Sequence, residues 1–292
     1  MITNTYKKTI KYFNKIINRG HNLIDMRGLN NDNPIVNSYY SKGRNFLIDV
    51  PLNKCRHFKF LGYSCTEDCD SPFISTLRKY SNLECNSYYG SPLEKFYDEF
   101  QPESVADIMG LSFFPDLNEI LKKTPPSGET AIWRSVSPAE QYILRKKQIE
   151  EDNLSHQHKL GAEEGEPFFG PVSERKGILE FNRLVKVYNS IRVNGYIPCK
   201  MGNHISGIVL LDDENWSCLI VSSGQHRIAS LAALGYKKVP IIIKNEVPGG
   251  ILRRSDVKYW PSVQNNLLTV EQALKVFDRI HKGIYHYKEI YI

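Results

Sequence analysis

The sequence predicts an α+β fold, with a small mixed sheet and helices packed around it. Residues 217–221 form a short apolar, partly β-branched run, which is typical of a buried strand. Residues 228–234 then place apolar side chains at helical spacing, and residues 235–243 form a tight turn and a second buried strand. Upstream, apolar residues recur every three or four positions over 178–191, which indicates an amphipathic helix.

Four regions follow from the composition along the chain. The chain has 292 residues, enough for one large domain or two moderate ones. Prolines and a glycine cluster at residues 122–128, which is the clearest break in the sequence. We therefore expect a largely helical N-terminal region over 1–128, a helix and polar linker over 129–167, the mixed-sheet domain over 168–246, and a helical C-terminal extension over 247–292.

The N-terminal region is predicted to be mostly helical. Residues 72–80 have a helical pattern. Pro92 after Ser91 marks a helix start, because proline is favoured at the first helical position and serine at the cap. Residues 45–50 favour a strand, and the alternating residues 57–60 are a candidate partner for it.

The first 18 residues interleave lysines with apolar side chains, as in a basic amphipathic helix. Such a helix binds an anionic membrane surface or packs on its own domain, and both alternatives stay open. The segment lacks the continuous apolar core of a signal peptide, and no apolar run approaches the roughly 20 residues that cross a bilayer. We therefore expect a cytoplasmic protein with reduced thiols and no transmembrane segment.

The charge balance points to an anionic ligand. The net charge is +6 and the sequence pI is near 8.8. This mild excess suits an anion such as a nucleotide. It falls short of the basic face of a dedicated DNA-binding protein, so DNA is not the expected partner.

Cysteines and histidines offer few metal-ligand patterns. Cys65 and Cys69 are separated by three residues, whereas the usual zinc-finger pair is separated by two, and no second tight pair is present. His156 and His158 are close in sequence but lack a third ligand in register. We therefore predict no metal site built from protein ligands alone.

The sequence after the linker adds two further elements. Residues 205–211 and 217–221 are predicted to pair as a β-hairpin, whose acidic connection is expected to be solvated. In the C-terminal extension, Thr269 is the predicted cap of a helix. Arg253 and Arg254 are candidate contacts for an anion in the cleft, although surface arginines are commoner than functional ones.

Residues 222–227, Ser-Ser-Gly-Gln-His-Arg, connect the first strand to the following helix. A glycine turn at a helix start directs backbone N–H groups and the positive end of the helix dipole at one spot, where a phosphate commonly binds. Arg227 would add a forked cationic donor and His226 a titratable one. The alternative is an ordinary strand-to-helix turn with an arginine in the first helical turn.

The series SGQHRIASLAALGYKKVPIII, residues 223–243, resembles the signature segment of the ParB/sulfiredoxin-like superfamily. Members of that superfamily share a Gly-x-(His/Arg)-Arg turn, a short helix, Leu-Gly, and Val-Pro before a strand. The likeness continues upstream through residues 189–198 and covers roughly 168–246. It implies a small mixed α/β domain that binds nucleotide phosphates at this turn, so ATP or CTP with Mg²⁺ are the expected ligands.

Three features select among the members of the superfamily. Gln225 stands where sulfiredoxins carry their catalytic cysteine, so thiol chemistry is not expected. Residues 247–292 are too short to supply the helix-turn-helix DNA reader of partition proteins. Gly224, His226 and Arg227 match the turn of the kinase members, which use a carboxylate to deprotonate an acceptor hydroxyl. The resemblance therefore implies phosphoryl transfer.

The resemblance covers the phosphate-binding turn, whereas the base has to be chosen from the carboxylates near it in the sequence. The phosphates are held by the main chain of Ser223, Gly224, Gln225 and His226 and clamped by Arg227, with His226 also a catalytic candidate. Glu180 is the preferred base or metal carboxylate, because the N-terminal end of its helix is expected to face the cleft. Glu174 is the second choice, and Arg183 is a further anion contact. The alternative for Glu180 is a surface residue paired with Arg183 or Lys176.

The whole chain also resembles uncharacterised proteins encoded among bacterial surface-polysaccharide genes. The segments that carry this likeness are residues 91–93, 100–102, 169–173 and 260–263. It implies that the acceptor is a sugar or a glycan precursor. Two function classes stay open: a kinase-like, nucleotide-dependent phosphotransferase acting on a small hydroxyl compound or sugar, and a non-catalytic nucleotide-binding module that contacts DNA or a membrane-associated assembly.

Overall fold

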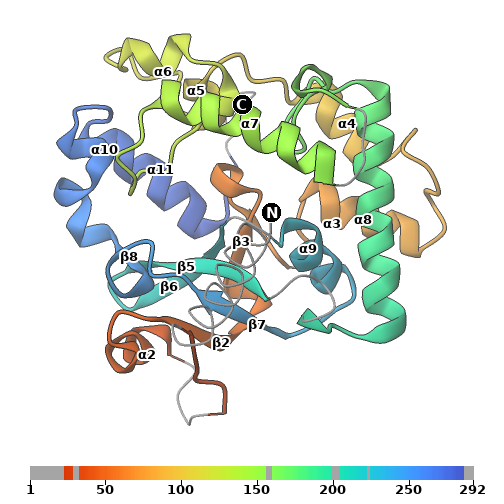
Figure 1. Ribbon diagram of the computed structural model, residues 1–292, viewed down its shortest axis with the longest axis horizontal. Coiled ribbons are helices and arrows are strands. Elements are labelled where there is room, and N and C mark those ends of the chain that lie inside the picture. The colour runs from red at the N-terminus through yellow and green to blue at the C-terminus, as the bar shows by residue number, and fades with distance from the viewer. Residues whose placement is uncertain are drawn as a thin grey trace, which may run out of the picture.

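The computed structural model describes residues 23–28, 33–66, 68–155, 160–198, 204–221 and 224–285. The basic segment 1–18, His156, His158 and Ser223 lie outside these ranges. The fold is α+β, as the sequence predicts, with one mixed sheet and helices around it (Figure 1). Within the described ranges, no helix combines the length and the apolar composition that a membrane span requires.

Eight strands of the described residues form one sheet, in the order β1-β2-β7-β5-β6-β3-β4, with β8 beside β5. Their bounds are β1 Leu23–Asp25, β2 Asn45–Pro51, β3 Cys55–His57, β4 Tyr63–Ser64, β5 Ile205–Asp212, β6 Asn215–Ile220, β7 Lys238–Ile243 and β8 Ile251–Arg253. The predicted hairpin is confirmed, because β5 and β6 are antiparallel with Gly207 opposite Ile220. β7 runs parallel to β5, with Ile205 opposite Ile241.

The N-terminal region contributes strands to both edges of this sheet. β2 pairs antiparallel with β7. The expectation that residues 57–60 pair with β2 is wrong: β3 lies between β6 and β4, with Cys55 opposite Cys218. A 3₁₀ turn at Leu52–Lys54 separates β2 from β3 and lets them join different parts of the sheet. The sheet therefore extends across the predicted boundary at residue 128.

Capping residues start several helices, and the predicted caps Ser91 and Thr269 are confirmed, whereas the helix predicted over 178–191 begins earlier, at Glu174. The helices are α2 Pro34–Ser41, α3 Pro72–Ser81, α4 Pro92–Glu99, α5 Val105–Ile108, α6 Glu119–Lys123, α7 Pro138–Ser155, α8 Glu174–Asn194, α9 Gln225–Ala233, α10 Pro261–Gln264 and α11 Val270–Lys282. Ser91 caps α4 and Ser173 caps α8 through side-chain oxygens. Thr269 and Gln272 form a capping box at α11.

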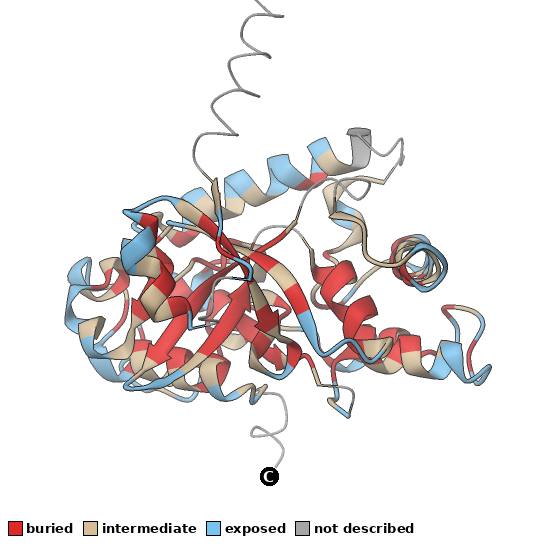
Figure 2. Ribbon diagram, turned by 90° about the horizontal axis from the view of Figure 1, so that it is seen from below, coloured by how far each residue is buried: buried red, intermediate tan, exposed pale blue. Residues whose placement is uncertain are grey.

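The hydrophobic core fixes the start of α9. Helices α3, α8 and α9 pack against one another, and α11 packs against β5 and β6. Ile228 and Leu231 of α9 are completely buried. Figure 2 shows the buried residues gathered on the strands and on the helices that adjoin them. Because α9 is held on several sides, its first turn has a defined position relative to β6 and α8.

Candidate functional site

The predicted glycine turn lies between the end of β6 and the start of α9. Gly224 is the N-cap residue of α9, and its φ of 118° is a conformation that side chains disfavour. A Cβ atom there would lie 3.0 Å from the side chain of Ile205, the first residue of β5. The helix begins at Gln225, earlier than the predicted residue 228. The first N–H groups of a helix have no partner within the helix, so those of α9 lie at the glycine turn.

The side chain of Gln225 has a structural role. Its Oε1 accepts a hydrogen bond from the Phe58 amide at 2.8 Å, and its Nε2 donates to the Ile220 carbonyl at 3.1 Å. The residue is buried, so these bonds are shielded from water. They join the start of α9 to β6 and to the chain that follows β3. The predicted phosphate role can therefore be met by the main chain of Gln225 and not by its amide.

Glu180 and His226, which are far apart in the sequence, lie side by side. Glu180 Oε2 is 3.3 Å from His226 Nε2. Glu180 Oε1 is 2.8 Å from Lys176 Nζ and 3.1 Å from Arg183 Nη1. The ring of Phe73 stacks on the imidazole, with centroids 4.8 Å apart. One carboxylate of α8 is thus shared by two cations of its own helix and a histidine of α9.

Glu180 is completely buried, which corrects the alternative of a surface residue while retaining its predicted partners. Burial by itself raises the pKa of the Glu180 carboxyl. The contact with His226 and the charges of His226, Lys176 and Arg183 outweigh burial and hold that pKa well below its usual range. Neither Glu180 Oε2 nor His226 Nε2 forms a well-aligned hydrogen bond within the described structure. The two atoms are within ion-pair distance but are not aligned as a hydrogen bond.

These side chains line a cavity of about 360 Å³, which we call the central cavity. The main chain at the start of α9 also belongs to its lining. The charged lining residues are the cations Lys59, Arg145, Lys176 and Arg183 and the carboxylates Asp152 and Glu180. Figure 1 shows α7, α8 and α9 arranged around this part of the molecule. The lining thus presents four cationic groups and two carboxylates, while the carboxylates that pair with Lys59 and Arg145, Glu129 and Glu166, are not part of it.

Lys59 and Arg145 are the two cations of the central cavity that the sequence does not single out. Lys59 Nζ is 2.5 Å from Glu129 Oε1, and Arg145 forms two hydrogen bonds to Glu166 Oε2, at 2.7 and 2.9 Å. Both cations also lie over the ring of Phe168, 5.0 and 5.9 Å from its centroid. Their positions depend on partners distant in sequence, which no local pattern reveals.

Arg227 points toward a neighbouring, smaller cavity. Together with Val187 and the turn from Gly224 to His226, it lines a space of about 240 Å³. Burial raises the pKa of the Tyr196 hydroxyl, and the charge and hydrogen bond of Arg227 only partly offset that rise. The glycine turn therefore separates two cavities, with Arg227 on one side and the Glu180 cluster on the other.

Glu174 does not reach the central cavity. It is exposed in the first turn of α8, about 9 Å along the helix from Glu180. Its carboxylate accepts a hydrogen bond from the Tyr89 hydroxyl. The structure therefore favours Glu180 over Glu174.

Arg253 and Arg254 also lie away from the cavity, contrary to expectation. Arg253 is opposite Leu211, so it lies about 20 Å along β5 from Ile205, which packs on Gly224. Arg254 Nε is 2.7 Å from the carboxylate of Asp278. The reason is that β8 pairs with the second half of β5, whereas the glycine turn packs on its first residue.

A nucleotide-bound Mg²⁺ has one suitable protein ligand at this site. Among the described residues, no three His, Cys, Asp or Glu side chains are grouped to hold a metal ion. Mg²⁺ bound with phosphates needs only one or two carboxylates, because phosphates and water supply its other ligands. Asp152 fits this role better than Glu180, since it lines the central cavity and its side chain is 44% exposed, although one of its oxygens is 3.3 Å from Arg183 Nη1. Glu180 fits less well, because both of its oxygens face cationic or titratable groups.

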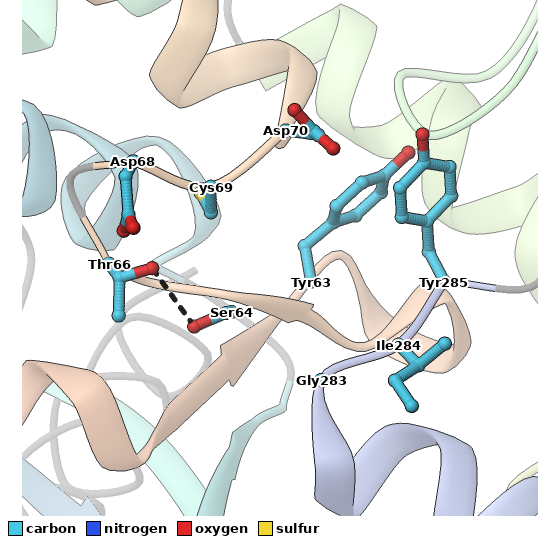
Figure 3. Close-up of a pocket in the computed structure, with 9 residues that line it drawn as sticks. All are labelled: Tyr63, Ser64, Thr66, Asp68, Cys69, Asp70, Gly283, Ile284 and Tyr285. Atoms are coloured by element: carbon cyan, nitrogen blue, oxygen red, sulfur yellow. Dashed lines mark hydrogen bonds between the residues drawn. The ribbon is translucent and has the colours of Figure 1, made fainter. Parts of the chain in front are cut away.

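Another hollow, of about 330 Å³, lies between β4 and the end of α11. Figure 3 shows Tyr63 and Tyr285 side by side there, together with Asp68, Cys69 and Asp70; the two tyrosine rings stack with centroids 4.6 Å apart. Burial raises the pKa of Cys69 to about 11, so its thiol is a weak nucleophile. The residues that line this hollow include none of the predicted catalytic or phosphate-binding residues.

Comparison of the chain with protein-family models, with curated proteins and with solved structures found no match. The ParB/sulfiredoxin-like resemblance therefore stays a prediction from the turn and the segments around it. The chemistry of the site has to be argued from its own geometry.

Proposed function

We propose that this protein is a nucleotide-dependent phosphotransferase that acts on a hydroxyl acceptor, either a small hydroxyl compound or a sugar. The observation that carries the proposal is the contact of the buried Glu180 with the partly buried His226 in the wall of the central cavity. The pair lies beside the start of α9 and beside four cationic side chains. Phosphoryl transfer uses these parts, because it needs clamps for the phosphates and an acceptor for the hydroxyl proton.

The phosphates would bind at the start of α9 and among the cations that face it. The N–H groups after Gly224 and the side chains of Lys59, Arg145 and Arg183 are the donors. Arg227, in the adjoining cavity, would bind another part of the same nucleotide. These groups recognise phosphate and not the base, so ATP and CTP are equally suitable donors.

The proton of the acceptor would pass to His226. With Nε2 turned toward Glu180, we assign the N–H of the neutral imidazole to Nε2, which leaves Nδ1 to accept a proton. The hydroxyl oxygen bonds to the terminal phosphorus while the bond from that phosphorus to the nucleotide breaks, and the departing diphosphate keeps the electron pair. Glu180 then stabilises the imidazolium. Glu180 thus acts on the acceptor through His226.

Two further lining residues have supporting roles. Asp152 would hold the Mg²⁺ that accompanies the nucleotide, and that ion would neutralise phosphate charge. Phe168 would limit the access of water, because its ring lies beneath both Lys59 and Arg145. Excluding water favours transfer to the acceptor over hydrolysis.

The second candidate function is a non-catalytic nucleotide-binding module. The observation that favours it is that both carboxylate oxygens of Glu180 already have partners. Its Oε1 contacts Lys176 and Arg183, and its Oε2 is buried against His226. In a non-catalytic module, the role of Glu180 would be only to position the cations that bind a phosphate. Turnover distinguishes the two functions, because only the phosphotransferase forms a phosphorylated product.

The test is a phosphorus NMR screen of ATP, ADP and CTP with Mg²⁺, each combined with serine, glycerol and free hexoses. We expect a new phosphate-ester signal for at least one pair, formed together with the nucleoside diphosphate when the donor is ATP or CTP and with AMP when it is ADP. Binding of a nucleotide without any ester or hydrolysis product would support the non-catalytic module. If no nucleotide binds, both functions are wrong.

A further inference from the structure

A second hollow, which we call the side chamber, lies next to the central cavity. Its volume is about 450 Å³. Lys59, Arg145 and Gln148 line both spaces, so they form a common wall. A molecule in the side chamber would therefore lie beside the anion that the central cavity favours, and its reacting hydroxyl would extend past this wall to reach His226, which lines the central cavity and not the chamber. Transfer of a group between two bound substrates requires this kind of proximity.

The side chamber combines an apolar surface with paired charges. Phe60, Trp133 and Val221 are among the apolar lining residues. Glu246 also lines the chamber, and its Oε2 is 2.5 Å from Nη2 of Arg134, a second lining residue. The Lys59–Glu129 pair, described above, belongs to the same lining. Each ion pair places strong hydrogen-bond donors and acceptors next to each other.

Trp133 carries an unsatisfied donor in this lining. Its side chain is only 8% exposed, and its indole N–H has no hydrogen-bond partner within the described structure. Buried polar groups in folded proteins nearly always have partners, and this donor is one of several in the described residues that have none. An aromatic ring with a free N–H offers both a packing surface and a donor to one ligand.

Helix α7 turns one face toward the chamber. Gln141, Leu144, Arg145 and Gln148 all line it, and their spacing places them on a single helical face. Two amide side chains thus face the same space as the two ion pairs. An amide group both donates and accepts hydrogen bonds.

We propose that the side chamber binds the acceptor and that the acceptor is a polyhydroxylated carbohydrate ring; this inference rests on the proposed phosphotransferase function. Each sugar hydroxyl donates one hydrogen bond and accepts others, so it needs carboxylates and amides close to cationic donors. The carbon–hydrogen face of the ring packs on an aromatic side chain, here Trp133. The chamber volume lies in the range of about 300–1,000 Å³ that is usual for small-molecule sites.

The experiment measures binding of sugars in the absence of nucleotide. Saturation-transfer NMR would be recorded on the full chain with glucose, galactose, mannose and N-acetylglucosamine, and with adenosine as the competing ligand class. We expect at least one sugar to bind. We also expect Trp133→Phe and Gln141→Ala each to weaken that binding about fivefold or more, because each removes hydrogen-bonding groups from the chamber.

Two control variants match these changes. Trp260→Phe removes another buried indole N–H without a partner in the described structure, but Trp260 lines neither cavity. Lys147→Ala changes the exposed side of α7. Both controls should bind the sugar as the parent protein does. If Trp133→Phe unfolds the protein, Gln141→Ala with Lys147→Ala still decides the question.

Three results would overturn the inference: no sugar binds, a sugar binds equally well to Trp133→Phe and Gln141→Ala, or adenosine binds in the chamber instead. Failure of the proposed function has a different signature. If a sugar binds in a way that depends on Trp133 but neither ATP nor CTP binds, the proposed phosphotransferase function is wrong. The proposal that the chamber binds a carbohydrate is then still supported. ATP hydrolysis without sugar binding would contradict the chamber assignment alone.

Discussion

Glu180 Oε2 lies 3.3 Å from His226 Nε2, and this contact joins the long helix α8 to the first turn of α9. The other oxygen of Glu180 holds Lys176 and Arg183. A buried carboxylate with these partners has two effects. It fixes the positions of three groups around the central cavity, and it can stabilise a proton on the imidazole.

Glu180→Gln should lose turnover and some stability. The substitution removes the negative charge that compensates Lys176, whose side chain is only 5% exposed. We expect the free energy of unfolding to fall by about 3 kcal/mol, measured by urea denaturation. Phosphorus NMR should show no phosphate-ester product, while calorimetry should still detect binding of the nucleotide. Glu174→Gln is the matched control on the same helix and should change neither quantity. A fully active Glu180→Gln protein would exclude Glu180 from the mechanism.

Arg227→Ala should weaken binding of ATP and CTP while the fold stays intact. A charge-assisted contact to phosphate contributes about 1.5–3 kcal/mol, so the loss should be tenfold or more. Isothermal titration calorimetry measures it directly. Arg192→Ala is a suitable control, because Arg192 is exposed near the end of α8 and lies over the ring of Tyr188. Unchanged nucleotide affinity in Arg227→Ala would refute the phosphate assignment of the turn.

Gln225→Ala should destabilise the protein without removing a phosphate ligand directly. The change leaves the Phe58 amide and the Ile220 carbonyl without the side chain that now pairs with them. We expect a loss of about 2–6 kcal/mol in the free energy of unfolding, because each of the two abandoned buried groups costs about 1–3 kcal/mol. Urea denaturation should show little change for Gln148→Ala, since Gln148 is exposed. If the free energy of unfolding is unchanged in Gln225→Ala, water molecules must replace both hydrogen bonds.

His57 should make the protein less stable in mild acid. Burial lowers the pKa of His57 from its ordinary value of 6.5 to about 3. As pH falls below 6.5, the unfolded chain therefore binds a proton that the folded chain excludes. The stabilisation is complete above pH 6.5 and is lost progressively down to about pH 3. At pH 5 the loss relative to neutral pH is about 2 kcal/mol.

The variant His57→Phe should flatten this dependence between pH 6.5 and pH 5, as measured by urea denaturation at several pH values. Phenylalanine suits the site because the imidazole already makes an edge contact with Phe58, with centroids 5.3 Å apart. Glu180 does not interfere in this window, because its lowered pKa affects stability only as pH falls below about 4.5. Equal pH slopes in the two proteins would show that His57 is protonated in the folded state.

The sequence by itself determined the local elements of this protein. Ser91 before Pro92 and Thr269 before Gln272 start helices through their own side chains, so short patterns predict them. The hairpin of β5 and β6 and the glycine turn follow in the same way, because each depends on neighbouring residues. His226 and Arg227 were candidates because of the turn motif, and Glu180 because the N-terminal end of its helix was expected to face the cleft; the contact between Glu180 and His226 joins two different helices and comes from their packing.

Only the tertiary structure decided which side chains share a cavity. Lys59 comes from the chain after β3 and Arg145 from α7, and buried carboxylates at Glu129 and Glu166 hold them there. Conversely, Arg254 is drawn to Asp278 and away from the turn. The physical reason is that an ion pair or a strand register is chosen by the packing of the whole chain. Local sequence patterns carry no information about a partner some 70 residues away.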